Sequence, residues 1–500
     1  MTDITHWISG APWPEPPART SPVYDPATGE VVAQVHLADA DVVKQAVASA
    51  VEAARSWRRS SLSQRTSVLF AFRQLLADWA PDLAAVITDE HGKVLSDALG
   101  EVTRGLEVVE FACGIPHLLK GSFSEGVSSG VDVHSIRQPL GVVAVISPFN
   151  FPAMVPLWFV PVALAAGNAV VLKPSEKDPS ASLLMARLWQ EAGLPDGVLT
   201  VLQGDREAVD GLLTHPDVRA VSFVGSTPVA RHVYETGTAH GKRVQALGGA
   251  KNHMLVLADA DLDQAADAAV NAGFGSAGER CMAISALVVV EEVADTLVRR
   301  IAERIYGLST GDGRRRCDMG PLITGEHRDR VVGLVGAGVD AGADLVVDGR
   351  LVEPDGDAGG FWLGPTLFDR VTPEMSIYTE EIFGPVLSVL RVRDYDEGLA
   401  LINANPYGNG TAIFTRDGRA AREFQYDVQV GMVGVNVPIP VPMAYYSFGG
   451  WKSSLFGDTH AHGMDGVHFF TRGKVVTSRW PEPAPDGPAA QADLSFPTHR

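Results

Sequence analysis

The chain has 500 residues, of which 46% are hydrophobic and 20% are charged, a composition typical of a soluble globular protein. Its formal net charge of −19 argues against the basic surface that nucleic acids require, so we expect no nucleic-acid partner. A chain of this length exceeds what one hydrophobic core usually serves, and two or more lobes are expected.

The cysteines, the N-terminus and the apolar stretches indicate the compartment. Cys113, Cys281 and Cys317 are an odd set without Cys-x-x-Cys spacing, so we expect neither a disulfide framework nor a metal site, and a reducing compartment fits best. The N-terminus lacks the charged and apolar regions of a signal peptide. Residues 151–171 are apolar but broken by prolines and a Gly-Asn turn, which predicts a buried helix followed by a strand and no membrane span. We therefore expect a cytoplasmic protein.

Two series of strands and helices follow a helical first part. Residues 40–120 predict long helices, because apolar residues recur there at helical spacing. From Gly141, short β-branched runs alternate with helical patterns, which is typical of a parallel sheet covered by helices on both faces. This first series has predicted strands at 142–146, 169–172, 198–202 and 220–224, and predicted helices at 180–192, 205–213 and 228–236. A second series begins near Met254 and predicts a second α/β lobe with strands at 284–290, 345–347, 386–392, 411–414 and 432–436.

Four segments lie outside these two series. Residues 403–410 are rich in Asn and Gly and predict a loop. Residues 131–137 and 467–479 are extended pieces that could pair as an edge sheet, and unpaired edges are often used for assembly. The tail, 481–500, is rich in Pro, Ala and Asp and predicts a poorly ordered end.

Cys281 is the first candidate for catalysis. It follows the small residues of Asn271-Ala-Gly-Phe-Gly-Ser-Ala-Gly, which leave room for a substrate, and Arg280 precedes it directly. A neighbouring cation favours the thiolate, which is the nucleophilic form of cysteine. The alternative is a buried, inert thiol, and this segment alone favours neither interpretation.

Two strand ends of the first series could bind a dinucleotide. Phe223-Val-Gly-Ser-Thr227 ends a predicted strand and opens a helix, so free backbone N–H groups and a hydroxyl could bind a phosphate. Lys173 and Glu176 lie at another strand end, the edge at which open α/β sheets bind ligands. Each segment alone fits an ordinary turn or a solvated charge, but two such ends in one sheet favour a dinucleotide that lies across them.

Two more segments carry side chains suited to this chemistry. Asn150 follows the first strand between prolines, and a carboxamide donor to a developing oxyanion can contribute roughly 3 to 4 kcal/mol. The alternative is an Asx turn. Glu381 and Phe383 could bind a ribose hydroxyl pair and pack on a flat ring, although adjacent carboxylates are ordinarily a solvated turn.

In this order, the segments resemble the aldehyde dehydrogenase superfamily over about residues 20–480. The resemblance implies an α/β fold with a Rossmann-type NAD-binding lobe, an α/β catalytic lobe and a small β arm for oligomerisation. The implied boundaries are 1–123 and 141–248 for the NAD-binding domain, 249–464 for the catalytic domain, and 124–140 with 465–480 for the arm. A homotetramer is expected, with a dimer as the alternative.

The resemblance also implies the site residues. Cys281 is the nucleophile, and Asn150 with the Cys281 backbone N–H binds the oxyanion. Lys173 and Glu176 bind the adenosine ribose, where Glu176 would repel a 2′-phosphate and so favours NAD over NADP. The implied NAD-binding residues are Ser147, Phe149, Lys173, Glu176, Gly225, Ser226, Glu381 and Phe383, with Ser226 at the pyrophosphate and Glu381 with Phe383 at the nicotinamide riboside.

Leu247 is the most informative departure from the family. The family usually has Glu-Leu-Gly-Gly-Lys, whose Glu is the base for the deacylating water, whereas this chain has Leu247-Gly-Gly-Ala-Lys251. An apolar side chain cannot take a proton from water, so deacylation uses another nucleophile, another base, or fails. This loss, with Gly-Glu-Arg-Cys-Met-Ala283 and Asn-Pro-Tyr-Gly-Asn-Gly410, resembles the CoA-acylating methylmalonate-semialdehyde dehydrogenases.

This subfamily resemblance implies a substrate and an acyl acceptor. The subfamily binds a semialdehyde carboxylate through two arginines that match Arg104 and Arg280, and arginine forks bind carboxylates bidentately. By itself, Arg104 fits equally well a helix surface residue paired with Glu101 or Glu107. The implied reaction is NAD-dependent oxidation of methylmalonate or malonate semialdehyde, with decarboxylation and transfer to CoA, which gives propionyl-CoA or acetyl-CoA. A CoA thiol is partly thiolate near neutral pH and so depends less on a strong base.

Two other functions stay open on the sequence. One is a hydrolytic NAD-dependent semialdehyde dehydrogenase that releases a free acid. The other is a non-catalytic protein of the same fold, against which the retained Cys281 and Asn150 argue. Valine, inositol and β-alanine catabolism can all deliver such semialdehydes, and the sequence does not separate them.

Overall fold

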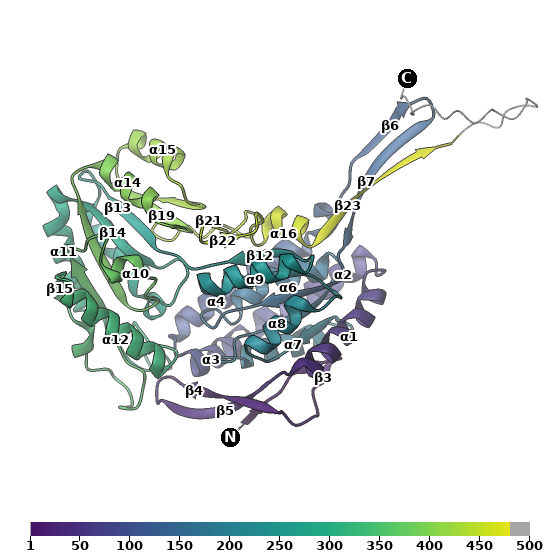
Figure 1. Ribbon diagram of the computed structural model, residues 1–500, viewed down its shortest axis with the longest axis horizontal. Coiled ribbons are helices and arrows are strands. Elements are labelled where there is room, and N and C mark those ends of the chain that lie inside the picture. The colour runs from purple at the N-terminus through teal and green to yellow at the C-terminus, as the bar shows by residue number, and fades with distance from the viewer. Residues whose placement is uncertain (1, 481–500) are drawn as a thin grey trace, which may run out of the picture.

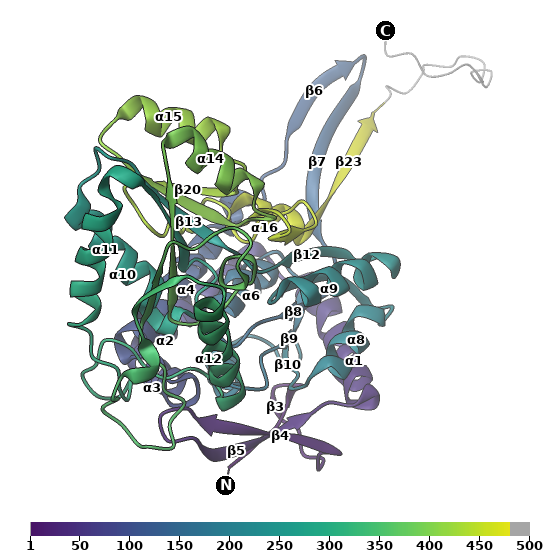
Figure 2. The ribbon, with the colours of Figure 1, turned by 60° about the vertical axis from the view of Figure 1, so that its left-hand side comes forward.

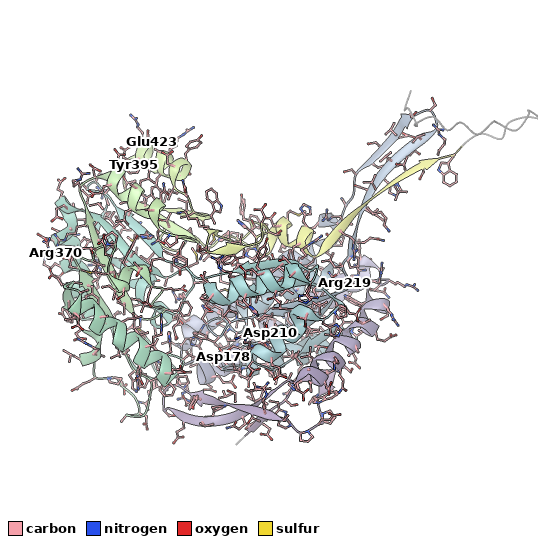
Figure 3. All side chains as sticks on the ribbon, viewed as in Figure 1. Asp178, Asp210, Arg219, Arg370, Tyr395 and Glu423 are labelled. Atoms are coloured by element: carbon pink, nitrogen blue, oxygen red, sulfur yellow. The ribbon has the colours of Figure 1, made fainter. Side chains whose placement is uncertain are left out.

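Two open α/β sheets and a protruding three-stranded arm make up the fold in the computed structural model, which describes residues 2–480 (Figure 1). The α/β class expected from the alternating patterns is confirmed. Side chains fill the layers between sheets and helices, whereas no layer covers the arm (Figure 3). The predicted disordered tail, 481–500, lies outside the described residues.

The predicted helical first part is confirmed as five helices. They are α1 (Ala40–Trp57), α2 (Leu62–Asp78), α3 (Ala80–His91), α4 (Leu95–Cys113) and α5 (Ile115–Leu118). The Asp39 carboxylate accepts the N–H groups of residues 41 and 42 where α1 begins, and Ser61 with Gln64 forms a capping box at α2. Before them, β1 (Thr2–Ile4), β4 (Arg19–Asp25) and β5 (Glu30–Leu37) form a small sheet, which lies at the opposite end of the molecule from the arm (Figures 1 and 2).

The first large sheet has the strand order β22-β12-β11-β8-β9-β10-β2-β3. Its parallel centre consists of β12 (Arg243–Leu247), β11 (Val218–Val224), β8 (Val142–Ile146), β9 (Ala169–Lys173) and β10 (Leu199–Val201), and its edges of β22 (Leu455–Phe456), β2 (Trp7–Ile8) and β3 (Ala11–Pro12). The helices of this lobe are α6 (Met154–Ala165), α7 (Ser180–Glu191), α8 (Arg206–Thr214) and α9 (Thr227–Ala239). Every residue of α6 is buried, which confirms the helix predicted from the apolar stretch.

Strand β12 was not predicted from the sequence. It contains Arg243 and Gln245, so it lacks the β-branched run that marked the other strands. In the structure, Gln245 is buried and its amide forms a 2.7 Å hydrogen bond with Ser222 of β11. Pairing with a neighbouring strand therefore satisfies a polar residue that the pattern could not place.

The second large sheet has the order β15-β16-β17-β14-β13-β19-β20. Its strands are β13 (Asn252–Val256), β14 (Ile284–Val290), β15 (Asp344–Val347), β16 (Thr366–Asp369), β17 (Val386–Val392), β19 (Gly410–Phe414) and β20 (Met432–Val435). Its helices are α10 (Leu262–Phe274), α11 (Glu291–Ile305), α12 (Gly325–Asp340), α13 (Ser376–Thr379), α14 (Tyr395–Ala404) and α15 (Gly418–Asp427). The predicted loop at 403–410 is partly wrong, because α14 extends to Ala404 and β18 (Tyr407–Gly408) pairs with β21 (Trp451–Lys452).

The arm is an antiparallel sheet of β6 (Phe123–Ser128), β7 (Val131–Pro139) and β23 (Thr471–Arg479), and it projects away from both lobes (Figures 1 and 2). The predicted pairing of the two extended pieces is confirmed by the register from Thr471 opposite Pro139 to Arg479 opposite Val131. The expected start of the second piece at residue 467 is wrong. Residues 467–469 belong to α16 (Gly463–Phe469), whose buried residues Gly463, Gly466 and Val467 recur at helical spacing. Within residues 2–480, no helix is both long enough and apolar enough to cross a membrane.

Candidate active site

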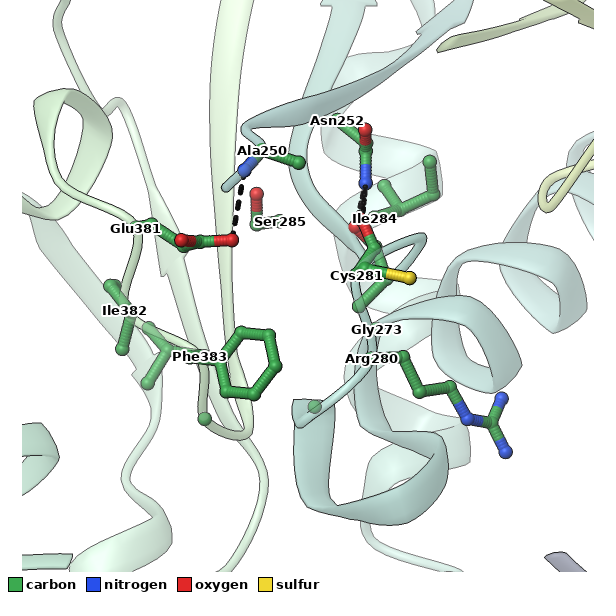
Figure 4. A pocket seen from close by; sticks show the side chains of 14 residues that line it. Ala250, Asn252, Gly273, Arg280, Cys281, Ile284, Ser285, Glu381, Ile382 and Phe383 are labelled. Atoms are coloured by element: carbon green, nitrogen blue, oxygen red, sulfur yellow. Dashed lines mark hydrogen bonds between the residues drawn. The ribbon is translucent and has the colours of Figure 1, made fainter. Parts of the chain in front are cut away.

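A pocket lined by Cys281, Glu381 and Phe383 lies at one edge of the second sheet (Figure 4). Strands β14 and β17 are parallel neighbours, so the segments that precede them meet at the same edge. Cys281 comes from the segment before β14, and Glu381 and Phe383 come from the segment before β17. The fold therefore brings together two motifs that are 100 residues apart.

The segment before Cys281 has an unusual backbone. Ser276, Ala277 and Gly278 all have positive φ angles, of 52°, 51° and 72°, which cost energy for the two residues that carry a side chain. A Cβ at Gly278 would lie 2.2 Å from the Gly384 carbonyl oxygen, so only glycine fits there. The strained turn packs directly against the segment that carries Phe383.

Two asparagine side chains hold the Cys281 peptide. Asn252 Nδ2 donates to the Cys281 carbonyl at 2.8 Å (Figure 4), and Asn409 Nδ2 donates to the same oxygen at 3.1 Å. Asn409 belongs to a motif that carried the subfamily resemblance, but no role was predicted for either asparagine. Because the carbonyl is fixed from two sides, the nucleophile is held on a rigid peptide.

Groups around the Cys281 thiol act on its pKa in opposite directions. Burial and then the Glu381 carboxylate raise the pKa of the thiol to about 12, and the Arg280 charge, a smaller effect, lowers it. The Arg280 guanidinium extends away from the sulfur (Figure 4), and its Nη2 lies 2.8 Å from Asp97 Oδ1. The Arg280 charge therefore favours the thiolate, as the sequence indicated, but burial and the Glu381 carboxylate outweigh it and raise the thiol pKa.

Asn150 meets the cysteine segment, as the sequence predicted. It follows β8 and is 3% exposed, and its Nδ2 donates to the Glu279 carbonyl oxygen at 3.0 Å. This bond spans 129 residues of sequence, so Asn150 is not merely part of a local Asx turn. A carboxamide has two N–H donors, and this bond uses one of them.

The predicted dinucleotide residues gather at the carboxyl ends of three neighbouring strands. Strand β8 lies between β9 and β11 in the sheet, so Ser147, Lys173 and Ser226 follow adjacent strand ends. The Ser147 N–H donates to the Lys173 carbonyl at 3.0 Å, and Lys173 Nζ lies 3.3 Å from Glu176 Oε2. At Gly225, a Cβ would lie 2.5 Å from the Phe223 ring, so the turn into α9 requires glycine.

Glu381 and Phe383 are held on the opposite wall. Glu381 Oε1 accepts the Ala250 N–H at 2.9 Å (Figure 4), and burial raises the pKa of this carboxyl to about 7. Lys251 Nζ supports the same turn by donating to the Glu380 carbonyl at 2.8 Å. The Phe383 and Phe149 rings meet edge to face, with centroids 5.8 Å apart, so the two lobes bring their aromatic rings together here.

Leu247 ends β12 and is 3% exposed. It pairs with Leu455 of β22, and its carbonyl accepts the Gly225 N–H at 3.1 Å. The position that the resemblance gives to a base is therefore occupied by a side chain of the apolar core. Among the described residues that line the Cys281 pocket, Glu381 is the one carboxylate.

The two arginines expected to bind a substrate carboxylate both have acidic partners. Arg280 pairs with Asp97, and Arg104 pairs with Glu107 at 2.7 Å, the alternative noted from the sequence. Asp97 and Arg104 are seven residues apart on α4, so they lie on one face at a separation of about 10 Å along the helix. Within residues 2–480, no group of three or more His, Cys, Asp or Glu side chains could hold a metal ion.

Comparisons with known proteins show the family of this chain. The aldehyde dehydrogenase family profile matches residues 13–476. A malonate-semialdehyde dehydrogenase of Pseudomonas aeruginosa is 55% identical over 468 residues, which cover 93% of this chain and 94% of the relative. A malonate-semialdehyde dehydrogenase 2 of Shouchella clausii is 50% identical over 479 residues, which cover 95% of this chain and 98% of the relative.

Solved structures give the same result. A protein of Sinorhizobium meliloti, described as a methylmalonate-semialdehyde dehydrogenase and complexed with NAD, superposes with a TM-score of 0.95 at 52% identity, covering 97% of this chain and 99% of that chain. The methylmalonate-semialdehyde dehydrogenase of Oceanimonas doudoroffii gives the same TM-score, identity and coverage. Because the family profile spans residues 13–476 and relatives at 50% identity or more are covered almost completely, this protein belongs to the aldehyde dehydrogenase family.

Proposed function

We propose that the protein is an NAD-dependent, CoA-acylating dehydrogenase of malonate semialdehyde and methylmalonate semialdehyde. The observation that carries this proposal is the buried Leu247 at the position of the family's base, in a chain that keeps Cys281 and Asn150 together. The names and identities of the relatives support the substrate. Small semialdehydes, CoA and NAD are the ligands that the proposal requires.

The residues at the edge of the first sheet fit NAD. The N-terminus of α9 offers free N–H groups to a pyrophosphate, and the Ser226 side chain caps no backbone group of that helix and can bind the same phosphates. Lys173 and Glu176 would hold the adenosine ribose, and Glu381 with Phe383 the nicotinamide riboside, with Ser147, Phe149 and Gly225 lining the site. When bound, NAD accepts a hydride from the substrate carbon.

Cys281 and Asn150 carry the acylation. The Cys281 thiol gives up its proton to solvent water and the sulfur bonds to the aldehyde carbon, which turns the carbonyl oxygen into an oxyanion. The free N–H of Asn150 and the Cys281 backbone N–H stabilise that oxyanion. Loss of the hydride then leaves a thioester on Cys281.

A thiol acceptor completes the reaction without a base at residue 247. The carboxylate on the carbon next to the thioester leaves as CO₂, and the resulting enolate takes a proton. The CoA thiolate then attacks the thioester carbon and releases the Cys281 sulfur. A thiol ionises more readily than water, so this step tolerates Leu247.

The division of the chain and its assembly are also proposed. Residues 1–123 and 141–248 would form the NAD-binding domain and 249–464 the catalytic domain. The arm, 124–140 with 465–480, would form the contacts of a homotetramer or a dimer, which its exposed apolar side chains support. The cysteines are all free, which supports residence in the cytoplasm.

The test is NADH formation from methylmalonate semialdehyde with and without CoA, with the product identified by mass spectrometry. Sustained turnover that requires CoA and yields propionyl-CoA is expected. One equivalent of NADH and no further turnover under both conditions would mean that the enzyme uses another acyl acceptor. Sustained CoA-free turnover would favour the hydrolytic enzyme, for which Glu381, with its pKa of about 7, is the available base.

A further inference from the structure

A buried ion pair contacts the Asn150 segment. The side chains of Lys93 and Glu101 are 1% and 0% exposed, and Lys93 Nζ lies 2.8 Å from Glu101 Oε2. Taking two charges out of water costs several kcal/mol per ion and is offset only when further hydrogen bonds satisfy both groups. Such a pair is weak evidence for stability, so its other contacts matter.

The other contacts of Lys93 and Glu101 lie at Asn150 and just after it in the chain. Lys93 Nζ also donates to the Asn150 carbonyl oxygen at 2.5 Å and lies 4.5 Å from the centre of the Phe151 ring. Glu101 Oε1 accepts the N–H groups of Ala153 and Met154 at 2.8 and 3.0 Å, where α6 begins. One charged pair therefore holds the backbone on both sides of the turn that follows Asn150.

The carboxamide of Asn150 is fixed from the other direction by the cysteine segment. Its Nδ2 donates to Glu279, two residues before Cys281, and that bond uses one of its two hydrogens. The direction of the second hydrogen therefore depends on where the Asn150 backbone sits. A donor to an oxyanion is effective only when it is placed to within a few tenths of an ångström, and a 1 Å misplacement can cost about 100-fold in rate.

Helix α4 connects this support to the nucleophile. Asp97 and Glu101 are four residues apart and so lie on the same face of α4. Asp97 Oδ2 accepts the Ser276 N–H at 2.9 Å in the strained turn before Cys281, while Glu101 holds the turn after Asn150. The spacing between nucleophile and oxyanion donor is thus set by one rigid helix.

We propose that Lys93, paired with Glu101, is a positioning residue that aims the Asn150 carboxamide at the oxyanion formed by Cys281. The proposal rests on the acylating roles of Cys281 and Asn150 in the proposed function, but not on the semialdehyde, on NAD or on CoA. Lys93 touches neither substrate nor cofactor and acts through the Asn150 backbone.

The experiment measures acylation of Cys281 by p-nitrophenyl acetate, whose ester carbonyl passes through the same kind of oxyanion and needs neither NAD nor CoA. The release of the first equivalent of p-nitrophenolate is followed by stopped flow, with Cys281→Ala as the blank. Failure of the semialdehyde assay therefore leaves this test intact. A wild-type enzyme without a Cys281-dependent burst would overturn the positioning role.

A double variant separates the positioning role from a role in stability. The double variant Lys93→Met, Glu101→Gln removes both charges and leaves no buried carboxylate unpaired. We expect its limiting acylation rate to fall about 100-fold, the scale of one lost oxyanion donor, with less than a threefold change in the ester concentration at half-maximal rate. Alkylation of Cys281 by iodoacetamide, which forms no oxyanion, should change less than twofold.

Non-additivity provides the second readout. Asn150→Ala should lower the acylation rate to a similar extent, and adding it to the double variant should lower the rate by less than threefold more, because the donor is already misplaced. Effects that multiply fully would overturn the proposal. Arg73→Met is the matched control, because Arg73 forms an exposed ion pair with Glu110 at the far end of α4 and should leave the rate unchanged.

Lys93→Arg covers the case in which the double variant does not fold. Arginine keeps the buried charge, but its planar fork cannot serve Glu101 Oε2 and the Asn150 carbonyl with the geometry of an ammonium. We expect an acylation rate about 10-fold below wild type, with unchanged iodoacetamide alkylation. A wild-type acylation rate in Lys93→Arg would overturn the proposal.

Discussion

The Cys281 thiol must lose its proton before the sulfur can attack a carbonyl carbon, and its surroundings oppose that loss. Burial and the Glu381 carboxylate raise the thiol pKa to about 12, while Arg280 is directed to Asp97. Glu381 is also the residue proposed for the nicotinamide riboside. A bound ligand that moves the Glu381 carboxylate away from the thiol would therefore change the reactivity of Cys281.

Replacement of Glu381 by Gln should make the thiol more reactive. Loss of a negative charge lowers the thiol pKa, so the alkylation profile with iodoacetamide should shift to lower pH and the rate at pH 8 should rise on the order of threefold. Glu380→Gln is the matched control, because its exposed carboxylate pairs with Arg330. An unchanged or slower rate in Glu381→Gln would show that burial alone sets the thiol pKa.

Replacement of Leu247 by Glu should supply the missing base. CoA-free NADH production should rise at least 10-fold, because a carboxylate at this position can take a proton from water. The site is buried, so the variant should also unfold at a lower temperature. Leu247→Gln separates the two effects, since it buries a polar group of the same shape without a base, and equal CoA-free rates in the two variants would contradict the role given to residue 247.

Residues with a strong local pattern could be predicted, and residues whose role depends on burial could not. Cys281 and Asn150 stand in distinctive segments, and the structure joins those segments through Glu279. Lys93, Glu101 and Asp97 are charged residues in a helical region, where a solvated surface is the ordinary interpretation. Only the packing of α4 against α6 shows that the Lys93–Glu101 pair is dry.

Helix α4 contacts both the cysteine segment and the turn that follows Asn150. It carries Asp97 beside the cysteine segment, Glu101 behind the Asn150 turn and Arg104 two turns from Asp97. The three residues are four and three positions apart, so they lie on one helical face. What that face contacts depends on distant loops, including the Pro442 carbonyl that accepts from Arg104 at 2.9 Å.

Recognition of the substrate carboxylate by Arg104 and Arg280 should appear in KM. Arg280→Gln and Arg104→Gln should each raise KM for malonate semialdehyde about 10-fold, because a charge-assisted bond to the substrate carboxylate is lost. KM for propanal, which has no carboxylate, should change less than twofold. Arg73→Gln serves as the control, because Arg73 lies on α2 and pairs with Glu110 at the far end of α4, and equal changes for both aldehydes would remove the charge argument.

At the scale of the whole molecule, alternating strand and helix patterns predicted both large sheets, because each strand buried on two faces is a short apolar run. The connection that closes the first sheet was not predictable. Strand β22 has two residues, and it returns from residue 455 to pair with β12 beside Leu247. Two residues carry no periodicity, so only tertiary contacts define this strand.

The arm gives the assembly its own test. Strand β23 exposes Val475 at 70%, and an apolar side chain on a protruding sheet is typical of a subunit interface. Val475→Glu should place a charge in that interface and reduce the assembly below four chains of 53.2 kDa, measured by light scattering after size exclusion. Lys474→Glu adds negative charge on the opposite face of the strand and should leave the mass unchanged. A wild-type enzyme that elutes as a single chain, or equal dissociation in both variants, would mean that this face of the arm is not the interface.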